Sequence, residues 1–184
     1  IFENGRLDGI LIKGSKEHTF LGLINKKVGA ELEQYMKEKH NRTITVSVAN
    51  DTVCLILSGL GRASWDHLAA GIVGTGLNFA LFFDKHTVIN LEAGGIANFP
   101  QTETGKANDA QSNMKGQGLF EKEVSGGYLY KHFNQLVQQH KIQHESLTDT
   151  TELSRLAAKN IPEVSAIAYE TLERSAAFVA TQIA

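Results

Sequence analysis

Two hydrophobic patterns alternate along the chain. Short runs rich in β-branched and aromatic residues are typical of strands, and longer stretches whose apolar residues recur every three or four positions are typical of helices. The strand-like stretches are residues 10–12, 43–49, 69–73, 79–84 and 87–91. The helix-like stretches are residues 25–40, 52–59, 119–141, 150–160 and 163–184. This succession predicts an α/β fold with a mixed sheet flanked by helices.

Residues 100–117 interrupt the succession. They hold Pro100, two glycines and many Asn, Gln, Thr and Ser side chains. Proline and glycine end regular elements, and short polar side chains compete for backbone hydrogen bonds. The segment is therefore predicted to be a loop.

Composition narrows the class of protein. The 184 residues are 42% hydrophobic and 21% charged, as in soluble globular domains of average size. The net charge of −2 gives no electrostatic reason to expect nucleic acid or an anionic membrane as partner. No apolar run approaches the roughly 20 residues that span a bilayer. The single cysteine, Cys54, excludes an internal disulfide and favours a reducing, cytoplasmic setting, and its apolar neighbours predict core packing.

The seven histidines predict no metal site. His140 and His144 have helical spacing, but no third ligand lies near them in the sequence. Surface histidine is the favoured interpretation, so we expect no metal ion ligated by the chain itself.

A polar Asn50-Asp51-Thr52 stands between two apolar runs, and it has two explanations that remain open. Asn, Asp and Thr are favoured helix N-caps, although one such residue is enough for a cap. Alternatively, the preceding strand brings Asp51 to the carboxyl edge of a sheet, where ligands of open α/β folds bind. There the positive N-terminus of a helix would keep the carboxylate ionised and able to accept a proton.

A glycine-rich turn, Gly74-Thr75-Gly76, follows the third strand-like stretch. Exposed backbone amides and a hydroxyl in such a turn can hold phosphate, but many hairpins have the same sequence. No helix-like pattern follows directly, as a dinucleotide fingerprint requires, and no Gly-Lys-Ser/Thr is present, as a Walker loop requires. A phosphate turn and a simple tight turn are thus both possible.

Several motifs occur together in a fixed order: Asn50-Asp51-Thr52-Val53, Gly74-Thr75-Gly76-Leu77-Asn78, Ile89-Asn90-Leu91-Glu92 and Gly116–Lys122 with Ser125-Gly126. This order resembles the hexokinase family of sugar kinases, within the actin-like, RNase H-like superfamily. Ser15-Lys16 upstream and Glu173–Ala177 downstream are also similar to family segments. Each motif is weak alone, but their joint order is specific and covers nearly the whole chain.

The resemblance implies ATP-dependent phosphorylation of a hexose, with Mg²⁺ arriving on ATP. Asp51 would be the base that takes the proton of the sugar 6-hydroxyl. The expected sugar ligands are Ser15, Lys16, Asn50, Asn78, Glu92 and Glu121, and the expected phosphate pocket is Gly74, Thr75 and Gly76. A carboxylate can accept hydrogen bonds from two adjacent hydroxyls, which suits a polyol.

The chain departs from the family pattern at several positions. Lys13-Gly14 stands where the family has Trp before its Ser/Thr-Lys, and Ala93 stands where Trp follows the first glutamate. Gly118 replaces a glutamine that normally helps to hold the sugar. These changes trim the contacts of the sugar pocket, so they bear on sugar identity before they bear on the type of reaction.

The resemblance also predicts a longer protein. The family's first phosphate loop and its sugar loop would precede Ile1, and its second nucleotide loop would follow Ala184. We expect residues 1–50 to be the end of the small sugar-binding lobe and residues 51–184 to be the core of the large lobe. The remainder of the polypeptide is expected to complete the site, so this portion alone would be inactive.

Three interpretations therefore compete. The first is a sugar kinase with Asp51 as base. The second is a hexokinase-like protein that binds sugar as a sensor or regulator without catalysis. The third is an actin-like or heat-shock-like ATPase lobe, which has no use for the polyol acceptors Glu92 and Glu121.

Overall fold

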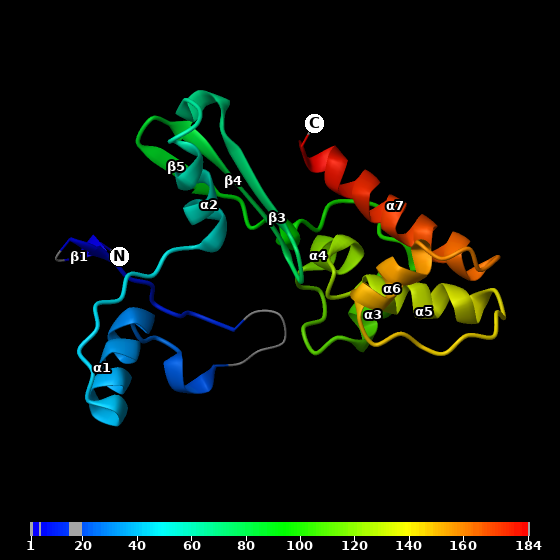
Figure 1. Ribbon diagram of the computed structural model, residues 1–184, viewed down its shortest axis with the longest axis horizontal. Coiled ribbons are helices and arrows are strands. Elements are labelled where there is room, and N and C mark those ends of the chain that lie inside the picture. The colour runs from blue at the N-terminus through cyan, green and yellow to red at the C-terminus, as the bar shows by residue number, and fades with distance from the viewer. Residues whose placement is uncertain (1, 4, 15–19, 184) are drawn as a thin grey trace. The chain divides into compact units, whose positions relative to one another are not determined.

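The computed structural model describes residues 2, 3, 5–14 and 20–183, and its α/β architecture is the one predicted (Figure 1). The chain forms two compact units. The first comprises Ile1–Ala70 and Leu81–Asn90, and the second comprises Gly71–Ala80 and Leu91–Ala184. A three-stranded antiparallel sheet supplies residues to both units. Its strands, in order, are β3 (Ala69–Val73), β4 (Leu77–Asp84) and β5 (Thr87–Asn90).

The first unit begins with a small hairpin, in which β1 (Phe2–Glu3) pairs antiparallel with β2 (Arg6–Leu7). The strand predicted at 10–12 is reduced to a single bridge between Ile10 and Lys27. A 3₁₀ turn, η1 (Leu21–Leu23), lies between the two bridged residues, and a long helix follows Lys27.

Helix α1 (Val28–His40) confirms the helix predicted from the period of its apolar residues. Its N-terminal amides are satisfied by Asp8, a residue far upstream. Oδ1 of Asp8 accepts a hydrogen bond from Gly29 N at 2.8 Å, and Oδ2 accepts one from Ala30 N at 3.1 Å. The bond from Gly29 is the main reason that the pKa of Asp8 lies below its ordinary value. Asp8 thereby anchors the start of α1.

The strand predicted at 43–49 is wrong. Alternate side chains of this extended segment are half-buried, so the pattern that suggested a strand is real. A strand also needs a hydrogen-bonding partner, and two of the backbone donors go to different elements. Val46 N donates to the Glu33 carboxylate at 2.7 Å, and Val48 N donates to the Leu7 carbonyl at 2.9 Å.

Helix α2 (Asp51–Gly59) begins one residue before the predicted start and packs against β5. It buries Thr52 and Ile56, which are four residues apart on one face. Cys54 lies on another face and is exposed, so the prediction that it packs in a core is wrong.

The predicted strands of the sheet are confirmed to within two residues at each end. A 3₁₀ turn, η2 (Trp65–His67), precedes β3. The Trp65 ring meets the Phe82 ring of β4 edge to face, with centroids 6.4 Å apart. The indole therefore packs on the sheet.

The second unit is mostly helical. After the 3₁₀ turn η3 (Ala93–Gly95) its helices are α3 (Glu103–Gln111), α4 (Leu119–Val124), α5 (Leu129–Gln139), α6 (Thr150–Ala157) and α7 (Val164–Ile183). Figure 1 shows α5, α6 and α7 side by side. No helix of the described residues has both the length and the apolar content to cross a membrane.

Two predictions in this unit are wrong. The segment predicted as a loop contains α3, whose N-cap is Thr102; its Oγ1 accepts a hydrogen bond from Gly105 N at 2.9 Å. The helix predicted over 119–141 is broken between α4 and α5, where residues 125–128 contact the turn after β3. Local pattern gave no sign of α3, because this helix is polar. The adjacent Gly126 and Gly127 were a local sign of the break, because glycine weakens a helix interior.

Two apolar clusters hold the second unit together. The larger joins α5, α6 and α7, and its fully buried centre is formed by Phe133, Leu153 and Ala168. The smaller surrounds Phe120 of α4, whose ring meets Phe99 and Phe178 edge to face, at 5.1 and 6.1 Å between centroids. Helix α4 is thus fixed on its apolar side.

Candidate active site

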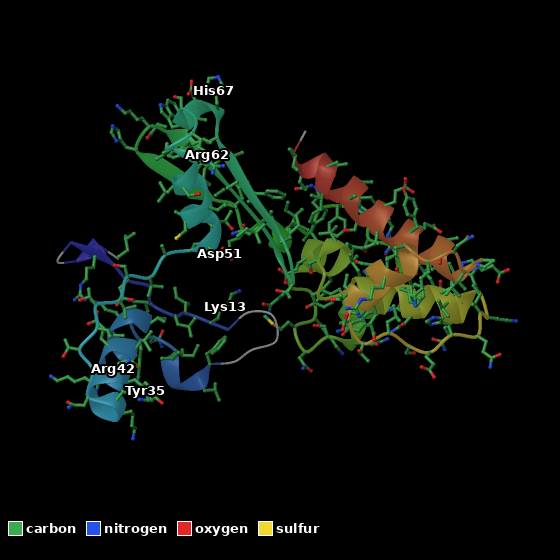
Figure 2. The ribbon with its side chains drawn as sticks, in the orientation of Figure 1. Lys13, Tyr35, Arg42, Asp51, Arg62 and His67 are labelled. Carbon is green, nitrogen blue, oxygen red and sulfur yellow. The ribbon has the colours of Figure 1, made fainter. Side chains whose placement is uncertain are left out.

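The N-terminus of α2 carries the first candidate residues (Figure 2). Asn50 is the N-cap, and its Oδ1 accepts hydrogen bonds from Thr52 N at 2.9 Å and Val53 N at 3.2 Å. Asp51 is the first helical residue; it is exposed, and its Oδ1 also accepts from Thr52 N, at 2.8 Å. Asn50 therefore supplies the cap, and the helix start does not require a carboxylate at Asp51. Such a group at the positive end of a helix can accept a hydroxyl proton.

The other candidates are distributed over the chain. Ser15 and Lys16 lie outside the described residues. Asn50 and Asp51 belong to the first unit, whereas the Gly74-Thr75-Gly76 turn and the remaining candidates belong to the second unit. The geometry of the second group is described next.

The Gly74-Thr75-Gly76 turn joins β3 to β4 and is held by the break between α4 and α5. The Gly74 carbonyl accepts a hydrogen bond from Gly126 N at 2.7 Å, and the Thr75 carbonyl accepts one from Ser125 Oγ at 3.0 Å. A trans peptide holds its N–H opposite its C=O. The amides of Thr75 and Gly76 therefore point away from these partners.

Two successive amides on one side of a turn form an anion-binding arrangement. Thr75 is exposed, so its hydroxyl lies on the accessible surface of the same turn. The turn is also the connection of a hairpin, so both explanations of its sequence apply. Gly76 is buried, so the Thr75 amide and hydroxyl are the groups that this turn offers to phosphate oxygens.

Two glycines lie behind this turn; Gly126 belongs to a motif noted in the sequence but was given no role, and Gly127 was missed. A Cβ on Gly126 would lie 2.9 Å from the Gly74 carbonyl oxygen, and a Cβ on Gly127 would lie 2.7 Å from the Thr75 carbonyl oxygen. Side chains at these positions would push the turn away. The adjacent glycines inside a helix-like pattern were the available signal, because glycine weakens a helix interior.

Glu92 follows β5 in an unusual backbone conformation. Its φ of 49° and ψ of 44° lie in the left-handed region, where residues other than glycine are uncommon. Glu92 is exposed. Asn78 supports the turn that follows, because its Oδ1 accepts a hydrogen bond from Ala93 N at 3.4 Å, as well as one from Phe79 N at 2.8 Å. Strained conformations of this kind persist where surrounding contacts impose them.

Glu121, in the first turn of α4, lies against the turn that follows Glu92. Its Oε2 accepts a hydrogen bond from Leu77 N at 3.1 Å. A Cβ on Gly94, two residues after Glu92, would lie 3.0 Å from the Glu121 Cβ. The second unit thus gathers Asn78, the turn that begins at Glu92 and the Glu121 carboxylate, which together offer amide and carboxylate acceptors to hydroxyl groups.

Gly118, the position that departs from the family pattern, is the N-cap of α4 with a φ of 58°. A Cβ there would lie 3.9 Å from both the Cβ and Oε1 of Glu121. A longer side chain at Gly118 would therefore stand beside this carboxylate. Its absence leaves Glu121 without a polar neighbour from that position.

Buried charges support α4 from behind. Lys122 is 2% exposed, and its Nζ lies 2.6 Å from Asp109 Oδ1 and 2.7 Å from the Met114 carbonyl. Partial burial opposes ionisation of Asp109, but the Lys122 ammonium and the Gly116 amide hold its pKa below the ordinary value. The pair fixes α4 to α3 and to the loop between them.

Glu123 and His132 are both fully buried in the second unit. Burial raises the pKa of Glu123, against the hydrogen bonds it receives from Thr102. Burial lowers the pKa of His132 to about 4, so its imidazole is neutral at pH 7. Glu123 was not singled out from sequence, and the expectation that the histidines lie on the surface is wrong for His132. A polar residue inside an apolar stripe gives no local sign of its burial.

No cluster of three or more His, Cys, Asp or Glu side chains in the described part of the chain has the geometry to hold a metal ion.

No family model matches the chain. It is 32% identical to the chloroplastic hexokinase-2 of Nicotiana tabacum over 139 residues, which are 66% of this chain and 27% of that protein. It is 30% identical to hexokinase-1 of Spinacia oleracea over 182 residues, which are 89% of this chain and 36% of that protein. The chain therefore spans about a quarter to a third of the length of these curated relatives.

A solved structure has the same fold. The hexokinase of Schistosoma mansoni, determined as a complex with glucose, superposes with a TM-score of 0.70 at 23% sequence identity. The match covers 98% of this chain and 53% of that chain. The fold of this chain thus corresponds to about half of that protein.

Proposed function

Because this chain belongs to the hexokinase family, we propose that the full-length protein transfers the γ-phosphate of ATP to the 6-hydroxyl of a hexose such as glucose. The observation that carries the proposal is the carboxylate of Asp51. It is exposed at the N-terminus of α2, although Asn50 already caps that helix. Asp51 acts as the general base that accepts the hydroxyl proton during attack on ATP.

Phosphoryl transfer requires mainly positioning and charge stabilisation from a protein. The exposed Thr75, whose amide is directed away from the residues behind the turn, supports a role in binding phosphate oxygens. Gly74 lets the turn close, since its N donates to the Gly76 carbonyl at 2.8 Å. Mg²⁺ would be carried by ATP and would neutralise phosphate charge.

The hexose assignment is supported by the polar groups gathered in the second unit. Glu92 and Glu121 each supply two acceptor oxygens, and Asn78 braces the turn between them. An ATPase lobe without sugar specificity has no use for two such carboxylates. Ser15, Lys16 and Asn50 are the other sugar ligands that we propose.

The proposed division into lobes places residues 1–50 in a small sugar-binding lobe and residues 51–184 in the large lobe. The two compact units of the structure are defined by packing, and their bounds differ from those of the proposed lobes. The remainder of the polypeptide would complete the nucleotide site. We propose a cytoplasmic location from the single cysteine, although one relative is a chloroplastic protein.

A second candidate function is a sugar sensor or regulator that does not phosphorylate. Gly118 favours it, because no side chain at this position reaches toward Glu121. A pocket with fewer contacts holds the reacting hydroxyl less firmly, and positioning supplies much of the rate of such a reaction.

The test measures sugar-dependent ADP formation and sugar 6-phosphate by the purified full-length protein over a panel of hexoses. Glu121→Gln is measured beside Glu103→Gln, which alters an exposed glutamate of α3. We expect turnover with a glucose-like hexose and a KM for sugar raised about 10- to 100-fold in Glu121→Gln alone, the range for losing a hydrogen bond to a charged group. Glucose binding without turnover would favour the sensor, and a lack of sugar binding would favour the ATPase lobe.

A further inference from the structure

Four buried or half-buried side chains form a continuous chain of polar contacts beneath α4. Glu123 Oε2 lies 2.9 Å from Thr102 Oγ1, which lies 3.1 Å from Thr104 Oγ1, which lies 2.7 Å from His132 Nδ1. At the far end, His132 Nε2 lies 2.7 Å from the carbonyl oxygen of Lys122. A contact here that lacks a hydrogen atom is costly, because water does not replace it in the interior.

With Glu123 and His132 in their ordinary protonation states, this chain of contacts has one hydrogen atom too few. With Glu123 ionised and His132 neutral, the two threonine hydroxyls and the imidazole provide three hydrogens for four contacts. Rotating the hydroxyls or changing the imidazole tautomer only moves the gap. Two acceptors then face each other somewhere along the chain.

One proton taken up from solvent completes it. The Glu123 carboxylic acid then donates to Thr102, and Thr102 donates to Thr104. Thr104 donates to Nδ1 of His132, and Nε2–H of His132 donates to the Lys122 carbonyl. The charge of the cluster rises by one, and every contact holds one hydrogen.

Burial, and not neighbouring charge, favours this proton on Glu123 over His132. Burial raises the pKa of Glu123, although Arg174 of α7 opposes the shift. Burial lowers the pKa of His132 to about 4, and Arg174 acts in the same direction. Arg174 is the charged group that acts on both Glu123 and His132, and Asp109 of α3 pairs with Lys122. When the chain of contacts takes up a proton, burial therefore favours its position on Glu123, and His132 stays neutral at pH 7.

The chain of contacts holds α4, the helix that carries Glu121. Helix α4 has six residues, and the Lys122 carbonyl and the Glu123 side chain are both members of the chain of contacts. His132 from α5 and Ser175 from α7, which donates to the Val124 carbonyl at 2.7 Å, satisfy carbonyls at the end of the helix. A displacement of so short a helix moves all its side chains together.

We propose that Glu123 and His132 are positioning residues for the sugar ligand Glu121, because they hold α4 through a hydrogen-bond chain that is complete when it carries one added proton. The inference rests on the proposed function of Glu121 as a sugar ligand. It predicts tighter sugar binding when the chain is protonated than when Glu123 is ionised.

The experiment measures the dissociation constant of glucose for the full-length protein by calorimetry between pH 5 and pH 9. Glu123→Gln is the informative variant, because its amide donates to Thr102 at every pH and accepts from the Thr102 amide. Glu103→Gln is the control, since Glu103 is exposed on the same helix as Thr104. Thr104→Val removes the middle of the chain with little change in shape.

In the wild type and in Glu103→Gln, the dissociation constant is expected to rise about fivefold with pH, the equilibrium ratio that one neutral hydrogen bond is worth. Glu123→Gln should keep the low-pH value throughout, and Thr104→Val should bind more weakly with no pH dependence. A pH profile of Glu123→Gln that matches the wild type would overturn this proposal alone. A lack of glucose binding by every protein would overturn it together with the proposed function.

Discussion

Replacing Asp109 by alanine would leave the buried charge of Lys122 without its ion-pair partner. The Lys122 side chain is 97% buried. Its ammonium donates to two acceptors, Asp109 Oδ1 at 2.6 Å and the Met114 carbonyl at 2.7 Å. Removing one partner of a buried ion pair costs about 3–5 kcal/mol, because the remaining charge is not solvated. Asp109 is 20% exposed, so we expect the low end, about 3 kcal/mol. That is a large part of the roughly 5–15 kcal/mol that stabilises a domain.

The assay is urea unfolding of the full-length protein, followed by circular dichroism. Glu103→Ala breaks the exposed Lys106–Glu103 pair on the same helix and should cost under about 0.5 kcal/mol. Lys122→Met should cost about 1 kcal/mol, less than Asp109→Ala, because it removes the charge and leaves Asp109 partly in water. Equal losses in Asp109→Ala and Glu103→Ala, or a larger loss in Lys122→Met, would refute the reasoning.

Two further predictions concern the buried chain of contacts. The pKa of His132 falls from 6.5 to about 4 on folding, so His132 binds a proton more readily in the unfolded state; about 3 kcal/mol of stability present above pH 6.5 should be lost as the pH falls toward 4. Comparing His132→Gln with the exposed-residue control His140→Gln in acid unfolding isolates this share, and equal acid sensitivity of the two variants would contradict it. Gly105→Ala would place a Cβ 1.7 Å from Glu123 Oε1 and should destabilise by about 2 kcal/mol in thermal unfolding, whereas Gly95→Ala, with open space around its Cβ, should be near neutral.

The sheet and the longest helices could be predicted from sequence because their signals are local. The strands between Ala69 and Asn90 and the helix from Val28 agree with the hydrophobic pattern to within a few residues. The segment 43–49 has the same kind of pattern but lacks a ladder partner. Periodicity describes which face is apolar, and it does not describe what lies opposite.

The candidate site could be predicted only in part. The order of the motifs pointed to Asn78, Glu92 and Glu121. All three belong to the second unit and lie around the turn that begins at Glu92. Their roles remain predictions. The supporting residues were missed because they act through distant contacts. Gly127 is close to the Thr75 carbonyl, and Glu123 is bonded to Thr102, 21 residues away.

The measurement that tests the central claim most directly is the rate of glucose phosphorylation by Asp51→Asn in the full-length protein. We predict a kcat reduced about 10²- to 10⁴-fold, the usual contribution of a general base, with a glucose dissociation constant close to that of the wild type. The control is Asp66→Asn, which alters an exposed aspartate of η2 and should leave kcat unchanged. An Asp51→Asn variant that phosphorylates glucose at the wild-type rate would contradict the account.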